Sequence, residues 1–143
     1  MKLFDRIRLK GRSDKPSIVA DSMVSDRWLS TTVTDGSDYT ISPSTRSEDH
    51  SGRIYVANAT GAFTFILPDP SVALNGYHYK FVNLADETLT VQCDGKIVAS
   101  NNAAADTVTL QTSTQLIGAE LVAWCNGTYW FVTRRGTETL VIA

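Results

Sequence analysis

The sequence predicts an all-β protein: a small antiparallel β-sandwich or jelly-roll-like domain, preceded by an extended N-terminal arm and expected to associate with copies of itself. Three observations lead to this prediction. From Arg53 onward, short runs rich in β-branched and aromatic residues alternate with turn signals. Residues 1–52 are rich in Ser, Thr and Asp and have few sustained hydrophobic periods. Residues 121–132 form a hairpin pattern that is apolar on both faces.

The predicted arm, residues 1–52, is basic at its start. Its first fifteen residues hold six basic and two acidic side chains, a net charge of +4, which leaves −6 for residues 16–143 because the whole chain carries −2. The alternation of Leu3, Ile7 and Leu9 with charged residues suits a strand that pairs with the edge of a partner. We therefore expect a partner-binding arm that uses Lys2, Phe4, Arg6, Arg8, Lys10, Arg12 and Trp28.

Two questions about this arm stay open from the residues. The spaced apolar groups at 18–20, 23–24 and 28–29 can dock on a partner or a neighbouring subunit, or fold back on the body. A basic arm can also bind nucleic acid, but only Phe4 is interleaved with the charges. An acidic protein surface is therefore at least as good a partner, and nucleic acid is not the expected one.

The predicted body, residues 53–143, consists of strands and short turns. Pro68-Asp69-Pro70 ends a strand, Asp86-Glu87 and Asp94-Gly95 are predicted hairpin turns, and residues 101–106 a small loop. Regularly spaced short strands are typical of a sandwich, a jelly roll or a barrel, and the pattern does not choose among them. The expected strands are 53–57, 62–67, 77–84, 88–93, 96–99, 107–111, 116–125, 128–134 and 138–142.

Asn126-Gly127 predicts a two-residue type I′ turn, because both positions of such a turn need a positive φ. Counting outward places Trp124 opposite Tyr129 and Val122 opposite Phe131 on one face. Ala123 then lies opposite Trp130, and Leu121 opposite Val132, on the other. One face should pack the core of the subunit, and the other should be covered by a second sheet or another subunit. The candidate core or oligomer-interface residues are Val122, Trp124, Tyr129, Trp130 and Phe131.

The sequence predicts neither an enzyme nor a cofactor or metal site. Residues 48–51 (Glu-Asp-His-Ser) and Asp86-Glu87 are the only clustered catalytic candidates, and a polar solvated loop explains the first cluster better. His50 and His78 are the only histidines, and no zinc or calcium spacing occurs. Cys93 and Cys125 are expected as free buried thiols rather than a disulfide.

Charges within residues 1–8 interrupt the apolar core that a signal peptide needs, and no apolar run approaches the roughly 20 residues that span a bilayer. We therefore expect synthesis in the cytoplasm and no membrane partner.

Several motifs follow one another in a fixed order in the predicted body. Residues 63–68 (Phe-Thr-Phe-Ile-Leu-Pro) end a strand in Leu-Pro, and residues 76–84 form a Gly-led strand that ends near an Asn. They are followed by a Val-containing strand at 89–91, the segment 95–97, Thr109-Leu110 and the closing Asn-Gly-Thr-Tyr-Trp hairpin at 126–130. In this order the motifs resemble a small β-domain of tailed-bacteriophage virion proteins, and the resemblance covers about residues 60–133. Head decoration proteins, head fibres and tail fibres carry versions of this domain.

The resemblance implies a homotrimeric structural protein on the capsid surface of a virion, made in the host cytoplasm. It implies a capsid decoration or head-fibre protein that binds the major capsid protein, or another virion protein, through its arm and stabilises the shell. The alternative is a tail or baseplate fibre protein that contacts a host receptor or glycan. The small acidic loops at 86–87 and 101–106 favour decoration.

A third class is a carbohydrate-binding β-sandwich that uses Trp130 and Tyr129 as a stacking platform. The apolar cross-strand partners of these residues favour a core or interface role instead.

Overall fold

The computed structural model describes residues 29–34, 38–46, 49–111, 116–136 and 139–143, and all structural statements below concern these residues. They form ten strands and a short 3-10 helix at Val72–Leu74, which confirms the all-β prediction. No helix in these ranges is long and apolar enough to cross a membrane. The strands are β1 (Leu29–Val33), β2 (Tyr39–Thr40), β3 (Arg53–Ala57), β4 (Phe63–Ile66), β5 (His78–Asn83), β6 (Leu89–Ala99), β7 (Asn102–Leu110), β8 (Glu120–Cys125), β9 (Trp130–Arg135) and β10 (Leu140–Ile142).

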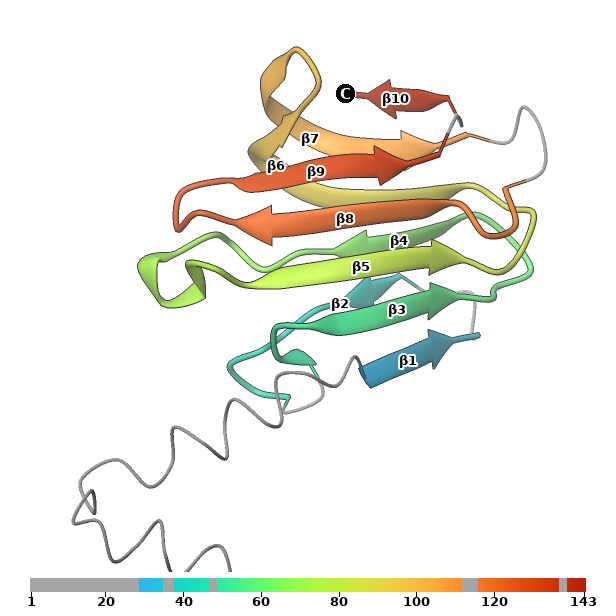
Figure 1. The fold of residues 1–143 in the computed structure, drawn as a ribbon, viewed down its shortest axis with the longest axis horizontal. Coiled ribbons are helices and arrows are strands. Elements are labelled where there is room, and N and C mark those ends of the chain that lie inside the picture. The colour runs from blue at the N-terminus through green and yellow to red at the C-terminus, as the bar shows by residue number, and fades with distance from the viewer. Residues whose placement is uncertain (1–28, 35–37, 47–48, 112–115, 137–138) are drawn as a thin grey trace, which may run out of the picture.

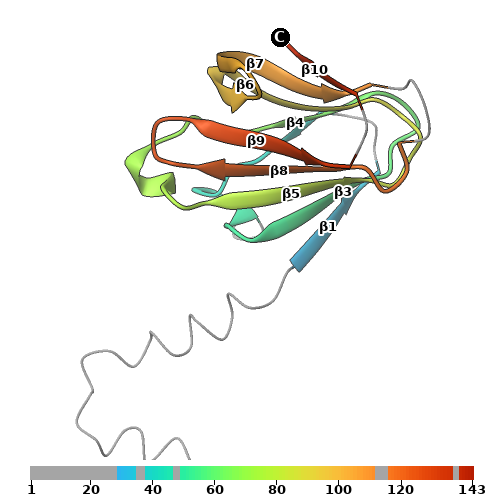
Figure 2. The same cartoon turned by 45° about the horizontal axis from the view of Figure 1, so that its top comes forward.

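The first six strands wind alternately through two layers (Figures 1 and 2). β1, β3 and β5 pair in parallel in one layer, and β2, β4 and β6 pair in parallel in the other. The hairpin β8–β9 extends the first layer by antiparallel pairing with β5, and β7 and β10 extend the second beyond β6. The successive strands β1 and β2, β3 and β4, and β5 and β6 thus form three turns of a coil, and the strands that follow add to the two layers by antiparallel pairing.

One strand, β6, joins the two layers. Its first half pairs with β4 and its second half with β9, and a bulge between Gln92 and Ile97 lies between the two halves. Gly95 in this bulge has φ +59°, and its N–H donates a 2.6 Å hydrogen bond to Oδ1 of Asp106. β1 and β2, at the two ends of the strand order, do not pair with each other, so within the described ranges the sheet is a nearly closed, barrel-like sandwich.

Aromatic rings from both layers fill the core. Every second residue of β3, β4 and β5 is buried, which places Tyr55, Phe65 and Phe81 inside. Tyr55 and Phe81 lie opposite each other on neighbouring strands of the first layer, and their ring centroids are 5.7 Å apart. The ring centroid of Phe65, in the second layer, lies 4.8 Å from that of Phe81. The alternation seen in the sequence is therefore the alternation between core and surface.

The antiparallel prediction is wrong for the first six strands. Alternating side chains look the same in parallel and antiparallel strands, and no long helix marks the crossovers, because each crossover runs through the opposite layer. The parallel pairs β1–β3–β5 and β2–β4–β6 are also not those of a jelly roll.

Two predicted turns are placed differently. Asp94-Gly95 lies in the bulge of one continuous strand, and the turn that follows is Ser100-Asn101, flanked by the Ala99–Asn102 pair. Asp86-Glu87 connects β5 to β6 in the other layer rather than forming a hairpin. The predicted loop at 101–106 belongs largely to β7.

The fold also begins before the predicted body. β1 pairs with β3 along its whole length, and Val33 and Ile41 are buried in the core. The described residues between 29 and 52 therefore belong to the sandwich. The sequence assigned these residues to the arm because β1 and β2 are short and rich in Ser and Thr, which weakens their strand signal.

Candidate functional site

The hairpin β8–β9 has a register different from the predicted one. Cys125 pairs with Trp130, and Trp124 pairs with Phe131, so the connection has four residues instead of two. Oδ1 of Asn126 accepts hydrogen bonds from the N–H groups of Thr128 (2.9 Å) and Tyr129 (2.8 Å), which stabilises this wider turn. The predicted pairs were wrong by two residues, a shift that leaves every side chain on its predicted face.

The inner face of this hairpin belongs to the core. Ala123, Cys125, Trp130 and Val132 are buried, and the indole Nε1–H of Trp130 donates a 2.8 Å hydrogen bond to the carbonyl oxygen of Pro68. This bond ties the hairpin to the loop between β4 and β5. Trp130 is therefore a core residue of the subunit and is not exposed for stacking on a sugar.

The outer face of the same hairpin carries a stacked aromatic pair. The rings of Trp124 and Phe131 lie 4.2 Å apart at an interplanar angle of 9°. Trp124 is 44% exposed, although large aromatic side chains contribute most when they are buried. Val122 lies on the same face, and Tyr129 lies half-buried in the turn.

Apolar side chains continue this face across the neighbouring strands. Because β3 and β5 bury alternate residues, their remaining side chains point away from the core on the side of Trp124. We call this surface the outer sheet face; its apolar members are Ile54, Val56, Val82, Val122, Trp124 and Phe131, and the polar side chains of His78, Lys80, Glu120 and Thr133 lie among them.

An ion pair between Lys80 and Glu120 crosses the outer sheet face, and both side chains are about one-fifth exposed. Lys80 lies opposite Val122, and Glu120 lies opposite Val82. A second protein surface that covered this face would therefore meet a charge-neutral pair rather than an uncompensated charge. The signal for the extended face in the sequence was the placing of Ile54, Val56 and Val82 two residues apart from their neighbours of the same face, but it did not by itself say which residues point outward.

The predicted arm residues Lys2, Phe4, Arg6, Arg8, Lys10, Arg12 and Trp28 lie outside the described residues. Their role stays a prediction.

The prediction of a solvated loop at 48–51 is wrong for Asp49, which is completely buried. Its Oδ1 accepts hydrogen bonds from the hydroxyls of Tyr39 (2.9 Å) and Tyr55 (2.8 Å), and its Oδ2 accepts one from the N–H of Ser42 (2.8 Å). The Tyr79 hydroxyl donates to its main-chain oxygen. Burial, followed by the hydrogen bond to Asp49, raises the pKa of Tyr55 well above its usual value of 10.0. Asp49 thus organises a set of tyrosines inside the fold.

Ser51 and His78 also meet, with Oγ and Nδ1 3.2 Å apart. The N–H of His78 donates a 3.0 Å hydrogen bond to the same oxygen, so the Ser51 hydroxyl ties its loop to the start of β5. No group of three metal-ligating side chains occurs in the described ranges. Cys93 and Cys125 are buried and not joined to each other, as predicted.

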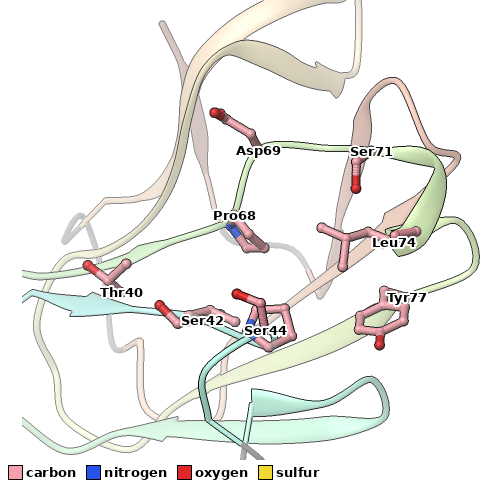
Figure 3. A pocket seen from close by; sticks show the side chains of 11 residues that line it. Thr40, Ser42, Ser44, Pro68, Asp69, Ser71, Leu74 and Tyr77 are labelled. Carbon is pink, nitrogen blue, oxygen red and sulfur yellow. The ribbon is translucent and has the colours of Figure 1, made fainter.

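A groove of about 480 Å³ lies at one end of the sandwich, between residues 40–44 and 68–77 (Figure 3). Its apolar part comes from Pro43, Pro68, Leu74 and the ring of Tyr77. The polar residues of its lining are Thr40, Ser42, Ser44 and Ser71, which carry hydroxyl groups, and Asp69, which carries a carboxylate. The sequence did not predict this groove, because its two walls come from segments that are far apart in the chain. Their Pro and Ser residues indicate turns but not that the two segments meet.

Comparison of the sequence with protein-family models and with curated proteins found no match. We therefore infer function from the two surfaces just described, the outer sheet face and the groove, together with the charge pattern of the chain.

Proposed function

We propose that this chain is a structural protein of a bacteriophage virion, a capsid decoration or head-fibre protein that forms a homotrimer and binds the outer capsid surface through its N-terminal arm. The observation that carries the proposal is the outer sheet face, where Trp124 and Phe131 stack outside the core. Aromatic and aliphatic side chains gathered on the outward side of a sheet are typical of a surface that another protein covers. The resemblance of residues 60–133 to virion β-domains supports the same proposal.

Closed symmetry makes self-association a natural use of this face. In a trimer, the outer sheet face of each subunit meets its neighbours around the axis, and growth stops at three copies. The Lys80–Glu120 pair then remains compensated when it is covered.

The arm supplies the second half of the proposal. Its charge of +4 over the first fifteen residues opposes the acidic remainder of the chain, so it suits an acidic partner surface rather than its own body. Three arms in one trimer raise the overall affinity by avidity, by a factor on the order of 10². A protein that binds only the assembled shell stabilises it by roughly 2.7 kcal/mol per site at a hundredfold excess over Kd.

The first test is the mass of the full chain in solution. Multi-angle light scattering should give three times the 15.6 kDa protomer mass for the wild type. Trp124→Glu should give the protomer mass, because it places a charge in the covered face. Val141→Glu is the matched control, since Val141 is an exposed apolar residue in the other layer, and it should remain a trimer. A monomeric wild type would contradict the proposal.

The second test is co-sedimentation with empty capsids of the phage that encodes the chain. Wild-type trimers should pellet with capsids, and the variant carrying Arg6→Glu and Arg8→Glu should stay in the supernatant while remaining trimeric. Trimers that do not bind capsids would instead favour the tail-fibre alternative.

A further inference from the structure

The groove between residues 40–44 and 68–77 shares no residue with the outer sheet face, so it calls for a separate explanation. Figure 3 shows Ser42 and Ser44 on one side of the groove, Leu74 and Tyr77 on the other, and Pro68 close to the two serines, while the carboxylate of Asp69 points away from these side chains. Its volume of about 480 Å³ falls within the range of small-molecule sites.

Both walls are held by groups buried in the core. On one side, the buried carboxylate of Asp49 accepts the N–H of Ser42, and the N–H of Ile41 bonds to the carbonyl oxygen of Ile66 at 2.9 Å. On the other side, the buried indole of Trp130 holds the carbonyl oxygen of Pro68.

The backbone of Tyr77 is fixed in the same way. Its N–H donates to the carbonyl oxygen of Leu74 (2.9 Å), and its own carbonyl oxygen accepts from the N–H of Cys125 (2.8 Å). A groove with walls anchored in this manner loses little conformational entropy when a ligand binds.

The lining selects the chemistry of the ligand. No lysine or arginine contributes to it, and Asp69 adds a negative charge, so phosphates and nucleic acids are disfavoured. The hydroxyls of Thr40, Ser42, Ser44 and Ser71 can donate and accept hydrogen bonds, and a purely apolar ligand would leave them unsatisfied. The Tyr77 ring, Leu74 and Pro68 offer a surface for an apolar face of a ligand.

A sugar ring combines these properties, because its faces carry C–H groups and its edges carry hydroxyls. We propose that the groove binds a neutral carbohydrate chain, with Tyr77 and Leu74 against a ring face and Ser42 and Ser44 as hydrogen-bond partners. For so small and open a site the dissociation constant should be on the order of 1 mM.

The test is a titration of the full-length, isotope-labelled protein followed by two-dimensional NMR. The probes are cellobiose, lactose, chitobiose and the methyl glycosides of mannose and galactose. At least one should shift the amide signals of groove-lining residues, with saturation at millimolar sugar. Should none of the five shift these signals at tenfold higher concentration, the proposal is overturned.

Variants assign the site. Ser44→Trp fills the groove from an exposed position and should raise the dissociation constant at least tenfold. Asn101→Trp places the same bulk in an exposed turn outside the groove and should bind as the wild type does. Unchanged affinity in Ser44→Trp would overturn the proposal.

The remaining outcome concerns a protein occupant. Groove signals that shift with protein concentration in the absence of sugar, and that Ser44→Trp abolishes, would identify a second copy of the chain as the occupant and overturn the carbohydrate proposal. Repeating the titration on Trp124→Glu separates this inference from the proposed function, since sugar binding should persist in that variant whether or not the wild type is a trimer.

Discussion

The carboxylate of Asp49 accepts three hydrogen bonds in a place from which solvent is excluded. Two of the donors are tyrosine hydroxyls from different layers of the sandwich, Tyr39 of β2 and Tyr55 of β3. Hydrogen bonds to a charged acceptor are stronger than neutral ones, and losing that acceptor would leave buried donors unsatisfied. Asp49 therefore joins the two layers where the described strands do not pair with each other.

Asp49→Ala should lower the free energy of unfolding by about 3 kcal/mol or more, because it removes the acceptor of all three donors. Asp49→Asn should cost less, since an amide oxygen can still accept from a tyrosine. The measurement is urea-induced unfolding followed by tryptophan fluorescence. Asp38→Ala is the matched control, because the exposed Asp38 accepts one bond, from the N–H of Thr64, and its loss should cost under about 1 kcal/mol. Equal losses for the two alanine variants would contradict this account.

Among the elements, the hairpin β8–β9 connects the core with the outer surface. Its turn depends on Gly127, which has φ +90°. A Cβ at this position would also lie 3.5 Å from the carbonyl oxygen of Ser71 and 3.5 Å from Cα of Val72. The turn thus packs against the segment that forms one wall of the groove, and the positive φ of Gly127 is the feature that favours glycine at this position.

Gly127→Ala should destabilise the protein by about 1–2 kcal/mol, because L-residues rarely adopt this backbone conformation. Gly61→Ala is the matched control, since Gly61 has no such φ and a Cβ there would meet nothing within 4 Å. The control should be neutral or slightly stabilising. Thermal unfolding monitored by circular dichroism compares the two, and equal melting temperatures would argue against a strained turn.

For the molecule as a whole, burial of tyrosine and cysteine side chains links stability to alkaline pH. Burial, followed by the charge of Asp69, raises the pKa of the Cys93 thiol from 9.0 to about 11. Burial is also the main cause that raises the pKa values of Tyr55 and Tyr79 far above 10.0. A raised pKa means that the folded protein holds these protons more tightly than the unfolded chain does, so the unfolded chain releases them first as the pH rises.

The free energy of unfolding should therefore be unaffected by these groups below pH 9 and fall from there to about pH 12. The slope should approach about 1.4 kcal/mol per pH unit for each group that stays neutral in the fold. Urea midpoints at pH 8, 9, 10 and 11 measure this, and Tyr55→Phe should reduce the slope because it removes one of the groups. A midpoint that does not change between pH 8 and 11 would refute the linkage.

The sequence by itself determined the all-β class, the positions of most strands from β3 to β9, and which side chains of the hairpin share a face. These depend on the alternation of side chains, which is local: Ala123 and Trp130 were placed on one face by counting, and a two-residue error in register did not change that. Cys93 alternates in phase with Leu89 and Val91, and this periodicity predicted its burial.

Only the tertiary structure decided which strands become neighbours. Parallel and antiparallel strands share the same alternation, so the parallel coils of β1 to β6 and the sharing of β6 between two layers left no local signature. The same holds for the candidate sites. Ser42 faces Tyr77 across the groove, and the hydroxyl of Tyr79 reaches the main-chain oxygen of Asp49, because the winding of the strands brings together residues that are distant in the chain. Trp124 and Phe131 are neighbours within one hairpin, and only the packing of the whole fold decided that their face lies outside the core.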